Sequence, residues 1–527
     1  MKKFAVLITG GFLLMNTAFA GGILTNTNQS AQFVRMLSRN ASTDLDAVYF
    51  NPAGLTQMEN GFYFGLNNQS IWQTRTINSG FFQPQTDATA FLSNHNSTFK
   101  GETSVPFFPD AYAVYKLDNW AFSVGFGPNA GGGTAKYNTG LPSFEKQIAS
   151  MSGGYQKLAP IFSGYQIPGV TDYGVDISFK GSSIFWGIQG GATYKVNKIL
   201  SVYLGARYVP TTNTYNGGIK NIKVTVAGNS IPASQYQTMV TPVMNGLIGS
   251  LQSSYQKIEG AISTKLIDGN ANIADPTLQG TLDLLGSKAK TYSEAVTSLK
   301  TTEAQLDQLN KSDLSDKAVD VKQTGGGVTP IIGFDIHLDK LNIGLKYEHT
   351  TIIGLTNKTV ADGTGLFPNG QKTNSDIPAI ISGGADYQIT DKLKISGSGT
   401  YFLDKNVNWG KNVYLQDRTI DKNFVELSFG LEYKITDDFA VSAGYMNSNT
   451  GVSEQYQSDF SYSNDSYTFG GGFQWKLTEK LVLDAGVLST TYKDATKAFT
   501  DPTFGKYNET YGKTTFDFAI GIGYKIF

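Results

Sequence analysis

Asn51-Pro52-Ala53-Gly54-Leu55 divides this chain of 527 residues into two parts of different character. A short helix-compatible segment precedes this stretch, and strand-like segments of alternating polarity follow it as far as Phe527. Proline fixes its own φ and has no N–H to give to a sheet. Asparagine favours turns, and glycine adopts backbone angles that other residues resist. The stretch predicts a junction between a small N-terminal segment and a sheet-rich remainder. An ordinary turn before a strand is the alternative.

Residues 1–20 have the pattern of a secretory signal peptide. Lys2 and Lys3 form a basic start, residues 4–15 are apolar, and Ala18-Phe19-Ala20 is a small-residue cleavage site. Cleavage after Ala20 is therefore expected. No later run approaches the roughly 18 apolar residues that a transmembrane helix needs.

The composition favours a membrane β-barrel over a set of soluble domains. Gly accounts for 59 residues and aromatic residues for 13%, whereas charged residues make up only 16%. The chain has no Cys and a formal net charge of −1, so neither a disulfide framework nor binding to nucleic acid is expected. A barrel strand shows lipid only every second residue, which keeps its average hydropathy moderate.

A hairpin pattern recurs along the chain. An aromatic residue (His337 in one case) ends a strand, a short polar turn follows, and a new apolar strand begins. Asp and Asn in the turns suit tight hairpins. The six occurrences lie at 115–120, 194–199, 337–341, 387–393, 433–439 and 475–481.

The strands between these turns alternate cleanly, as residues 425–435 and 516–526 illustrate. Alternation alone fits both a soluble sheet and a transmembrane barrel. Short and long connections alternate, however, and the aromatic residues gather at the short-turn ends, as in outer-membrane barrels. Six turns give twelve strands, and strands near 61–77 and 513–527 complete fourteen. An all-β, 14-stranded antiparallel transmembrane barrel is predicted. Both chain termini are expected on the periplasmic side of the membrane, where the short turns lie.

The long connection at about 216–322 is expected to contain helices. Apolar residues there recur at helical spacing, and two interpretations stay open. The segment is either a helical cap that packs on itself or an apolar groove for a greasy ligand. The residues of the pattern are Met239, Val243, Leu247, Leu251, Ile258, Ile262 and Leu266, followed by Leu282, Leu285, Leu299, Leu306 and Leu309.

No constellation of residues predicts catalysis. The only histidines are His95, His337 and His349, and without Cys a zinc site is not expected. Carboxylates such as Glu426 and Glu432 are interpreted as lining the lumen rather than as the acids of a barrel enzyme. We expect no metal, no cofactor and no enzymatic activity.

Three stretches resemble the FadL/TodX family of outer-membrane transporters of long-chain fatty acids and hydrocarbons. They are residues 44–55, 109–115 and 122–128. In the first, Asn51, Pro52 and Ala53 match the Asn-Pro-Ala motif that ends the family's N-terminal hatch. The resemblance implies a signal peptide at 1–20, a hatch at 21–56, and a barrel at 57–527 in the outer membrane of a Gram-negative bacterium.

The resemblance also implies passive uptake of a hydrophobic small molecule with lateral release through the barrel wall. Gly125, Gly127 and Pro128 would form the kink at the opening, because Gly weakens a strand and Pro cannot donate to a ladder. The helix-compatible run 30–39 offers ligand contacts, at Phe33, Val34, Met36 and Leu37. A non-transporting surface protein, such as an adhesin or receptor, is the alternative.

Further partners expected are outer-membrane lipids and the barrel-assembly machinery, the latter through the C-terminal Phe527; a monomer is expected. Two features depart from the family pattern. The insertion at 216–322 is longer than the family's outer loop, and Tyr524 lies one position away from the usual aromatic spacing before Phe527.

Overall fold

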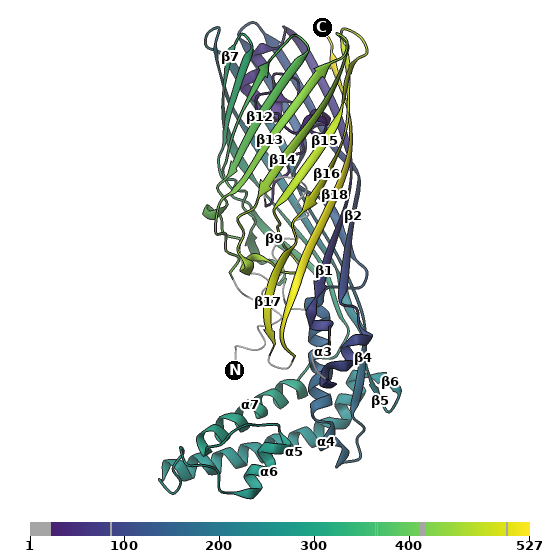
Figure 1. The fold of residues 1–527 in the computed structure, drawn as a ribbon, viewed down its shortest axis with the longest axis vertical. Coiled ribbons are helices and arrows are strands. Elements are labelled where there is room, and N and C mark those ends of the chain that lie inside the picture. The colour runs from purple at the N-terminus through teal and green to yellow at the C-terminus, as the bar shows by residue number, and fades with distance from the viewer. Residues whose placement is uncertain (1–22, 85–86, 364, 366, 410–416, 502–503) are drawn as a thin grey trace.

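A computed structural model describes residues 23–84, 87–363, 365, 367–409, 417–501 and 504–527, so the expected signal peptide lies outside the described residues. The described chain forms a closed antiparallel barrel of fourteen strands (Figure 1). In order around the wall these are β1 (Gly61–Ser79), β2 (Thr98–Leu117), β3 (Trp120–Tyr137), β4 (Val170–Lys195), β5 (Leu200–Val226), β7 (Lys317–Leu338), β8 (Leu341–Glu348), β11 (Ile380–Gln388), β12 (Leu393–Phe402), β13 (Phe424–Lys434), β14 (Phe439–Asn449), β15 (Ser466–Lys476), β16 (Leu481–Tyr492) and β18 (Gly505–Lys525).

Pairing of β1 with β18 closes the barrel, with Tyr63 opposite Lys525. All six predicted short turns join neighbouring strands at the same end of the barrel, and the predicted strand number is confirmed. The barrel also begins and ends there, since the Phe62 amide donates to the Phe527 carbonyl at 3.3 Å. The first described residue, Ile23, lies elsewhere, buried inside the barrel.

The two faces of the wall confirm the transmembrane interpretation of the alternation. On β18, Phe518 and Ile520 are 43% and 44% exposed, whereas Asp517, which directly precedes Phe518, is 1% exposed. Apolar side chains therefore cover the outside and polar ones the inside, the reverse of a soluble sheet. Among the described residues, no helix has the length and apolar character needed to span a membrane.

The wall is taller on one side than on the other. Strands β1–β5, β7 and β18 run for 18–27 residues, whereas β8 and β11–β16 run for 8–12. Strands β5 and β7 run into the connection expected at about 216–322, since β5 ends at Val226 and β7 begins at Lys317. The sequence pattern placed these strand ends too early. Pairing between the strands continues beyond the lipid, where outward-facing residues need not be apolar and the alternation of polarity is lost. Short strands β6 (Asn229–Pro232), β9 (Gly354–Asp362), β10 (Lys372–Asn374) and β17 (Ala495–Asp501) extend this outer end.

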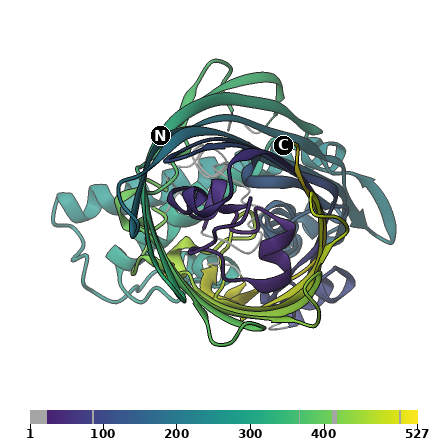
Figure 2. The same cartoon turned by 90° about the horizontal axis from the view of Figure 1, so that it is seen from above.

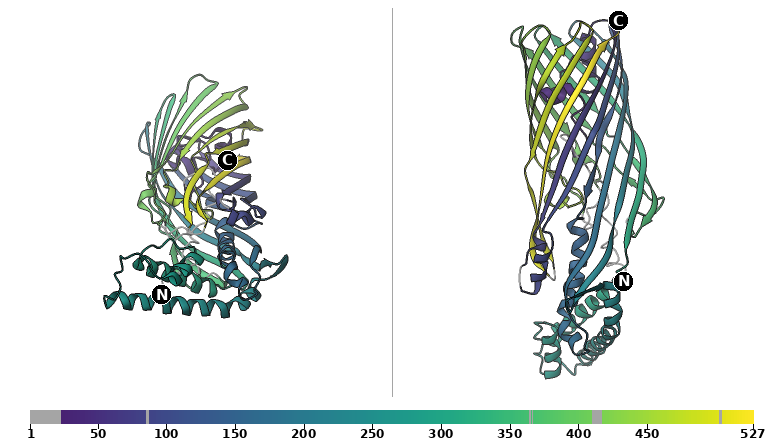
Figure 3. Two further views of the ribbon diagram at one scale, coloured as in Figure 1. Left: turned by 60° about the horizontal axis from the view of Figure 1, so that its bottom comes forward. Right: turned by 90° about the vertical axis from the view of Figure 1, so that its right-hand side faces the viewer.

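Helices gather at the end of the barrel opposite the short turns (Figures 1 and 3). They are α3 (Pro142–Lys157), α4 (Ala159–Ser163), α5 (Ala233–Ser263), α6 (Pro276–Leu284) and α7 (Tyr292–Asn310), with short 3-10 helices η3 (Gly80–Phe82), η4 (Asp87–Asn94), η5 (Asp404–Asn406) and η6 (Glu454–Tyr456). Within the insertion, α5, α6 and α7 pack on one another through a shared apolar cluster. The insertion therefore packs on itself.

The expected stripe on α5 was partly wrong. Met239 is 42% exposed and Leu266 is 80% exposed, whereas Leu251 and Ile258 are buried as predicted. The buried face instead includes Val240 and Met244, one position beyond the expected Met239 and Val243, and it starts earlier, at Tyr236. Tyr236 packs edge-on against Tyr155 of α3, with 5.2 Å between ring centroids.

The N-terminal segment folds inside the barrel (Figure 2). It comprises α1 (Ala31–Met36), α2 (Ala47–Phe50) and the 3-10 helix η2 (Pro52–Gln57), and we call residues 23–57 the hatch. Ser30 caps α1, because its Oγ accepts the Phe33 amide at 2.9 Å. The helix lies directly on wall glycines, so that a Cβ on Gly444 would collide with the Met36 carbonyl oxygen.

This close approach gives the first prediction. Gly444→Ala should displace α1 from the wall and destabilise the hatch, because backbone atoms cannot move aside as a flexible side chain can. Faster hydrogen exchange of residues 31–37 would report the change. Gly397→Ala is the matched control, because a Cβ there meets nothing within 4 Å. Equal exchange in the two variants would contradict the prediction.

A histidine links three parts of the outer layer. His95 Nε2 lies 2.8 Å from Asp172 Oδ1 at the outer end of β4, and Nδ1 lies 3.4 Å from Glu145 Oε1 on α3. Only the imidazolium offers a donor to both carboxylates. Burial lowers the pKa of His95, but the hydrogen bonds to Glu145 and Asp172 outweigh burial and raise the pKa above its ordinary value.

The raised pKa fixes the pH dependence of this link. Its contribution to stability is fully present below the ordinary pKa of 6.5 and is lost as the pH rises through the higher folded value. We expect His95→Gln to speed proteolysis of the loop at 87–97 at about pH 6 and to have little effect at about pH 9. The same substitution at the exposed His349 serves as control. An equal effect of His95→Gln at both pH values would contradict the assignment.

Candidate functional site: the hatch and a gap in the wall

Buried ion pairs fasten the helical part of the hatch near the short-turn end. Arg35 on α1 donates to Glu432 of β13 at 2.6 Å and to Asp484 of β16 at 2.8 Å. Arg39 donates to Asp46 within the hatch at 2.7 Å. Removing one partner of such a buried pair leaves an uncompensated charge, which costs about 3–5 kcal/mol. The ion pairs therefore hold α1 and α2 firmly.

The Asn-Pro-Ala motif joins the hatch to the wall. Asn51 Nδ2 donates to Asp335 Oδ1 of β7 at 2.7 Å and to the Ser42 carbonyl at 3.1 Å. The Pro52 carbonyl accepts a hydrogen bond from Thr193 of β4 at 2.7 Å. Ala53 is fully buried and packs with Tyr203 and Ile331 of the wall. The motif is thus a structural clamp between the hatch and strands β4, β5 and β7.

The ladder between β2 and β3 is interrupted. The strands pair at Thr103 with Ala135 and again at Ala111 with Phe126, but residues 104–110 and 127–134 form no pairs with each other. On its other side β3 keeps its pairing to β4 through two register shifts, between Pro128 and Ala130 and between Gly131 and Gly133. Gly131 and Gly132 have φ of 63° and 113°, a backbone region that favours glycine. We call the unpaired region the wall gap.

The start of the hatch occupies the inner side of the wall gap. The Asn26 amide donates to the Asn129 carbonyl at 2.9 Å, and Thr25 bridges Ala130 as an antiparallel pair. Asn26 Nδ2 also donates to the Pro128 carbonyl at 3.1 Å. The carbonyls that β3 does not share with β2 are in this way satisfied by the hatch.

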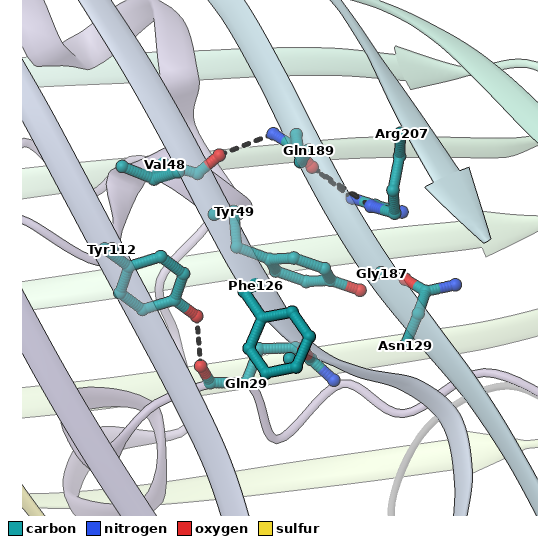
Figure 4. A pocket seen from close by; sticks show the side chains of 11 residues that line it. Gln29, Val48, Tyr49, Tyr112, Phe126, Asn129, Gly187, Gln189 and Arg207 are labelled. Carbon is teal, nitrogen blue, oxygen red and sulfur yellow. Dashed lines mark hydrogen bonds between the residues drawn. The ribbon is translucent and has the colours of Figure 1, made fainter. Parts of the chain in front are cut away.

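A small cavity lies between the hatch and the kinked part of β3 (Figure 4). Its free space is about 10 Å³, roughly room for one water molecule. Gln189 Nε2 donates to the Val48 carbonyl at 2.6 Å and Tyr112 donates its hydroxyl proton to the Gln29 carbonyl. The wall is closed here by side chains. The lining residues are Gln29, Val48, Tyr49, Tyr112, Gly125, Phe126, Gly127, Asn129, Gly187, Gln189 and Arg207.

One hatch residue connects the cavity to charged groups of the wall. The ring of Tyr49 lies between Arg207 and Lys346, 4.8 Å and 4.6 Å from its centroid. Both cations also bind Glu348, Arg207 at 2.5 Å and Lys346 at 2.7 Å. The hydroxyl of Tyr49 donates to the Asn26 carbonyl at 3.3 Å, so Tyr49 supports the segment that fills the wall gap.

The predicted kink residues and the predicted ligand contacts lie in different places in the structure. Gly125 and Gly127 line the cavity, and Pro128 lies at the bulge beside the wall gap. Phe33, Val34 and Leu37 instead pack in a cluster with Phe50 and Leu488, and Met36 packs against wall glycines. These four lie away from the cavity, and their contact with a ligand stays a prediction.

Sequence reasoning missed several residues of the cavity. Tyr49, Tyr112, Gln189 and Arg207 come from the hatch and from β2, β4 and β5, and nothing in their local sequence marks them. The available signals are the positions of Tyr49 inside the family-like stretch 44–55 and of Tyr112 inside the stretch 109–115.

The clamp at Asn51 gives a testable expectation. Asn51→Ala removes both donors of the amide and leaves Asp335 and the Ser42 carbonyl short of a partner, which costs about 1–3 kcal/mol. Amides of residues 44–50 should exchange faster. Asn60→Ala, at an exposed amide bound to Asp118, should leave these amides unchanged. No difference between the two variants would contradict the clamp.

Comparisons with known proteins agree with the fold. The crystal structure of a Pseudomonas aeruginosa FadL homologue matches over 96% of this chain and 100% of that chain, with 14% identity and a TM-score of 0.56. The Pseudomonas putida toluene transporter TodX matches over 96% and 100%, with 13% identity and a TM-score of 0.49. The Ralstonia pickettii toluene transporter TbuX covers 92% and 94%, at 12% identity and a TM-score of 0.46.

No protein-family model matches the sequence, and a search of curated proteins gives no match. At these identities the likeness concerns the fold, and of the three structures named above the FadL homologue has a TM-score above 0.5. The chain therefore shares the fold of the FadL homologue, and the fold expected from the resemblance to the FadL/TodX family is confirmed.

Proposed function

We propose that this protein is a channel for passive uptake of hydrophobic small molecules across the outer membrane of a Gram-negative bacterium, with lateral release through the wall gap. The interruption between β2 and β3, filled on its inner side by a removable segment of the hatch, carries this proposal. The neighbouring folds of a FadL homologue and of toluene transporters support a hydrophobic ligand.

Physical chemistry favours a sideways exit for such a ligand. Each CH₂ moved from an apolar site into water costs about 0.8 kcal/mol, so release into the aqueous periplasm opposes transport. Release into the membrane avoids this cost. Outside the wall gap, Phe126 stacks on Trp186 at 5.0 Å, and Phe107 is 78% exposed, so aromatic groups flank the exit.

Apolar residues lead from the outer end to the wall gap. A cluster of buried side chains joins Ile23 and Leu24 of the hatch to Ala130 of β3 and to Trp409 and Tyr456 of the outer loops. A second and larger apolar cluster occupies the outer layer, from the loops to the helices. A hydrophobic ligand that displaces Ile23 and Leu24 would meet Ala130 at the wall gap.

Passive operation follows from the size of the hatch. A transporter driven by the inner-membrane energy-coupling complex uses a far larger plug and about 22 strands. The hatch of this chain is short and the barrel has fourteen strands. Assembly through the C-terminal Phe527, contact with outer-membrane lipids and a monomeric state belong to the same proposal, as does the absence of enzymatic activity.

A disulfide that locks the hatch onto β3 tests the proposal. Thr25 and Ala130 are antiparallel bridge partners, whose Cα atoms lie about 4.5–5.5 Å apart, within disulfide range. Because the chain has no Cys, a Thr25→Cys/Ala130→Cys pair introduces the only disulfide. We expect oxidation to stop uptake of a hydrophobic probe into liposomes, and reduction to restore it.

The matched control locks a bridge of the same kind outside the barrel. Asn272 and Thr291 are antiparallel bridge partners in the helical insertion, and oxidation of a cysteine pair there should leave uptake unchanged. Continued uptake with residues 25 and 130 joined would exclude the wall-gap route. No uptake by the reduced protein would favour the alternative of a surface adhesin or receptor.

A further inference from the structure

Two parts of the hatch are held by different kinds of contact: ion pairs in one part and hydrogen bonds to carboxyl groups in the other. Arg35 and Arg39 fasten the helical part through buried ion pairs. The segment at 26–29, which fills the wall gap, is held instead by carboxyl groups of the barrel. Thr27 Oγ1 donates to Glu426 Oε2 at 2.7 Å, and Asn28 Nδ2 donates to Asp517 Oδ2 at 3.3 Å.

A third carboxyl group belongs to the same network. Asn28 Nδ2 also donates to Gln69 Oε1 at 2.9 Å, and Gln69 Nε2 donates to the Asn28 carbonyl at 2.7 Å. The same Gln69 nitrogen donates to Asp110 Oδ2 at 3.2 Å. Gln69 thus joins Asp110 on β2 to Asp517 on β18 through the hatch.

These acids have no cationic partner. Asp110, Asp517 and Glu426 are 0%, 1% and 3% exposed. Within the part of the chain that the structure describes, no salt bridge involves any of the three. Oδ1 of Asp110 and Oδ1 of Asp517 each lack a hydrogen-bond partner among the described residues. A buried carboxylate without compensation is strongly disfavoured, so the neutral carboxylic acid is the stable form.

The titratable groups nearby do not change this conclusion. Asp110 and Asp517 interact unfavourably with each other when both are charged. Tyr49 and Tyr112 lie near Asp110. Tyr49 and Tyr492 lie near Glu426. None of these phenols carries a positive charge. Arg207, which lies against the ring of Tyr49, is bound by Glu348 at 2.5 Å.

The position of Asp110 connects this chemistry to the exit. Asp110 is the last unpaired residue of β2 at the wall gap. Across the gap, a Cβ on Gly127 of β3 would collide with Asp110 Oδ1, so this oxygen lies directly against the kink. A charge on Asp110 would therefore draw water to the place where the hatch meets β3.

We propose that closure of the wall gap is linked to protons taken up by Asp110, Asp517 and Glu426. The three acids are neutral while residues 26–29 fill the gap, and they ionise when this segment withdraws and water enters. Opening releases protons, so a rise in pH favours the open gap. This inference rests on the proposed function, because it concerns control of the same exit.

Hydrogen exchange of the purified full-length protein tests the proton linkage without any transport assay. Asp110→Asn/Asp517→Asn mimics the neutral acids, because each asparagine keeps an accepting oxygen and cannot ionise. For release of one proton, the opening equilibrium rises about tenfold per pH unit. Over the pH range in which the acids are neutral in the closed state and ionised in the open one, we expect exchange at residues 23–30 in the natural protein to gain about tenfold per pH unit on the variant, and to level off at higher pH.

Two controls isolate the effect. Residues 44–50, fastened by ion pairs, should exchange equally in both proteins at every pH. Asp437→Asn, in an exposed short turn, should behave like the natural protein. Equal exchange at 23–30 in the natural protein and the double variant at all pH values would overturn the proton linkage. A dependence on the concentration of Na⁺ or Ca²⁺ in place of pH would overturn it as well.

Uptake of a hydrophobic probe into liposomes separates this inference from the proposed function. We expect uptake to rise with pH in the natural protein and to stay low and pH-independent in the double variant. If exchange responds to pH in the natural protein while neither protein takes up the probe, the proton linkage stands and the proposed transport fails. If both take up the probe equally at every pH, transport stands and the linkage is wrong.

Discussion

A barrel of fourteen strands encloses more space than its own inward side chains fill, since about eight strands give a filled interior and 16–18 an open channel. The hatch resolves this constraint, and much of the interior serves to hold it. Small wall residues such as Gly444 let α1 lie on the strands, while Arg35 and Arg39 are fully buried because they bind carboxylates. The inward-facing residues of the wall therefore contact the hatch, and the outward-facing residues contact lipid.

The strength of these contacts is unequal along the hatch. Ion pairs near the short turns fix the helical part, and the clamp at Asn51 ties its end to β7. The segment that meets β3 relies on neutral hydrogen bonds and on apolar contacts of Ile23 and Leu24. Local opening draws on the least stable contacts of a protein. The proposed movement at the wall gap would therefore leave the anchored part of the hatch in place.

The sequence predicted the barrel well because its signals are local. Alternation along β18 and the tight turns between strands appear within short windows, and they predicted the strand number. The buried face of α5 was partly misplaced, and Tyr236 on this face packs against Tyr155 of α3, a contact between distant parts of the chain that local spacing does not show. The cavity escaped prediction for the same reason, since Arg207 and Tyr112 meet only through the curvature of the barrel.

The interruption between β2 and β3 is bounded on both sides, because the ladder resumes at Thr103 with Ala135 and at Ala111 with Phe126. The unpaired region is therefore enclosed by paired segments of β2 and β3 at both ends, and the two strands stay joined above and below it. The unpaired stretch of β2 spans seven residues, 104–110, or about 23 Å at 3.3 Å per residue. Under the proposed lateral release, a departing molecule would break no hydrogen bond between strands, so the perimeter of the barrel would keep its strength.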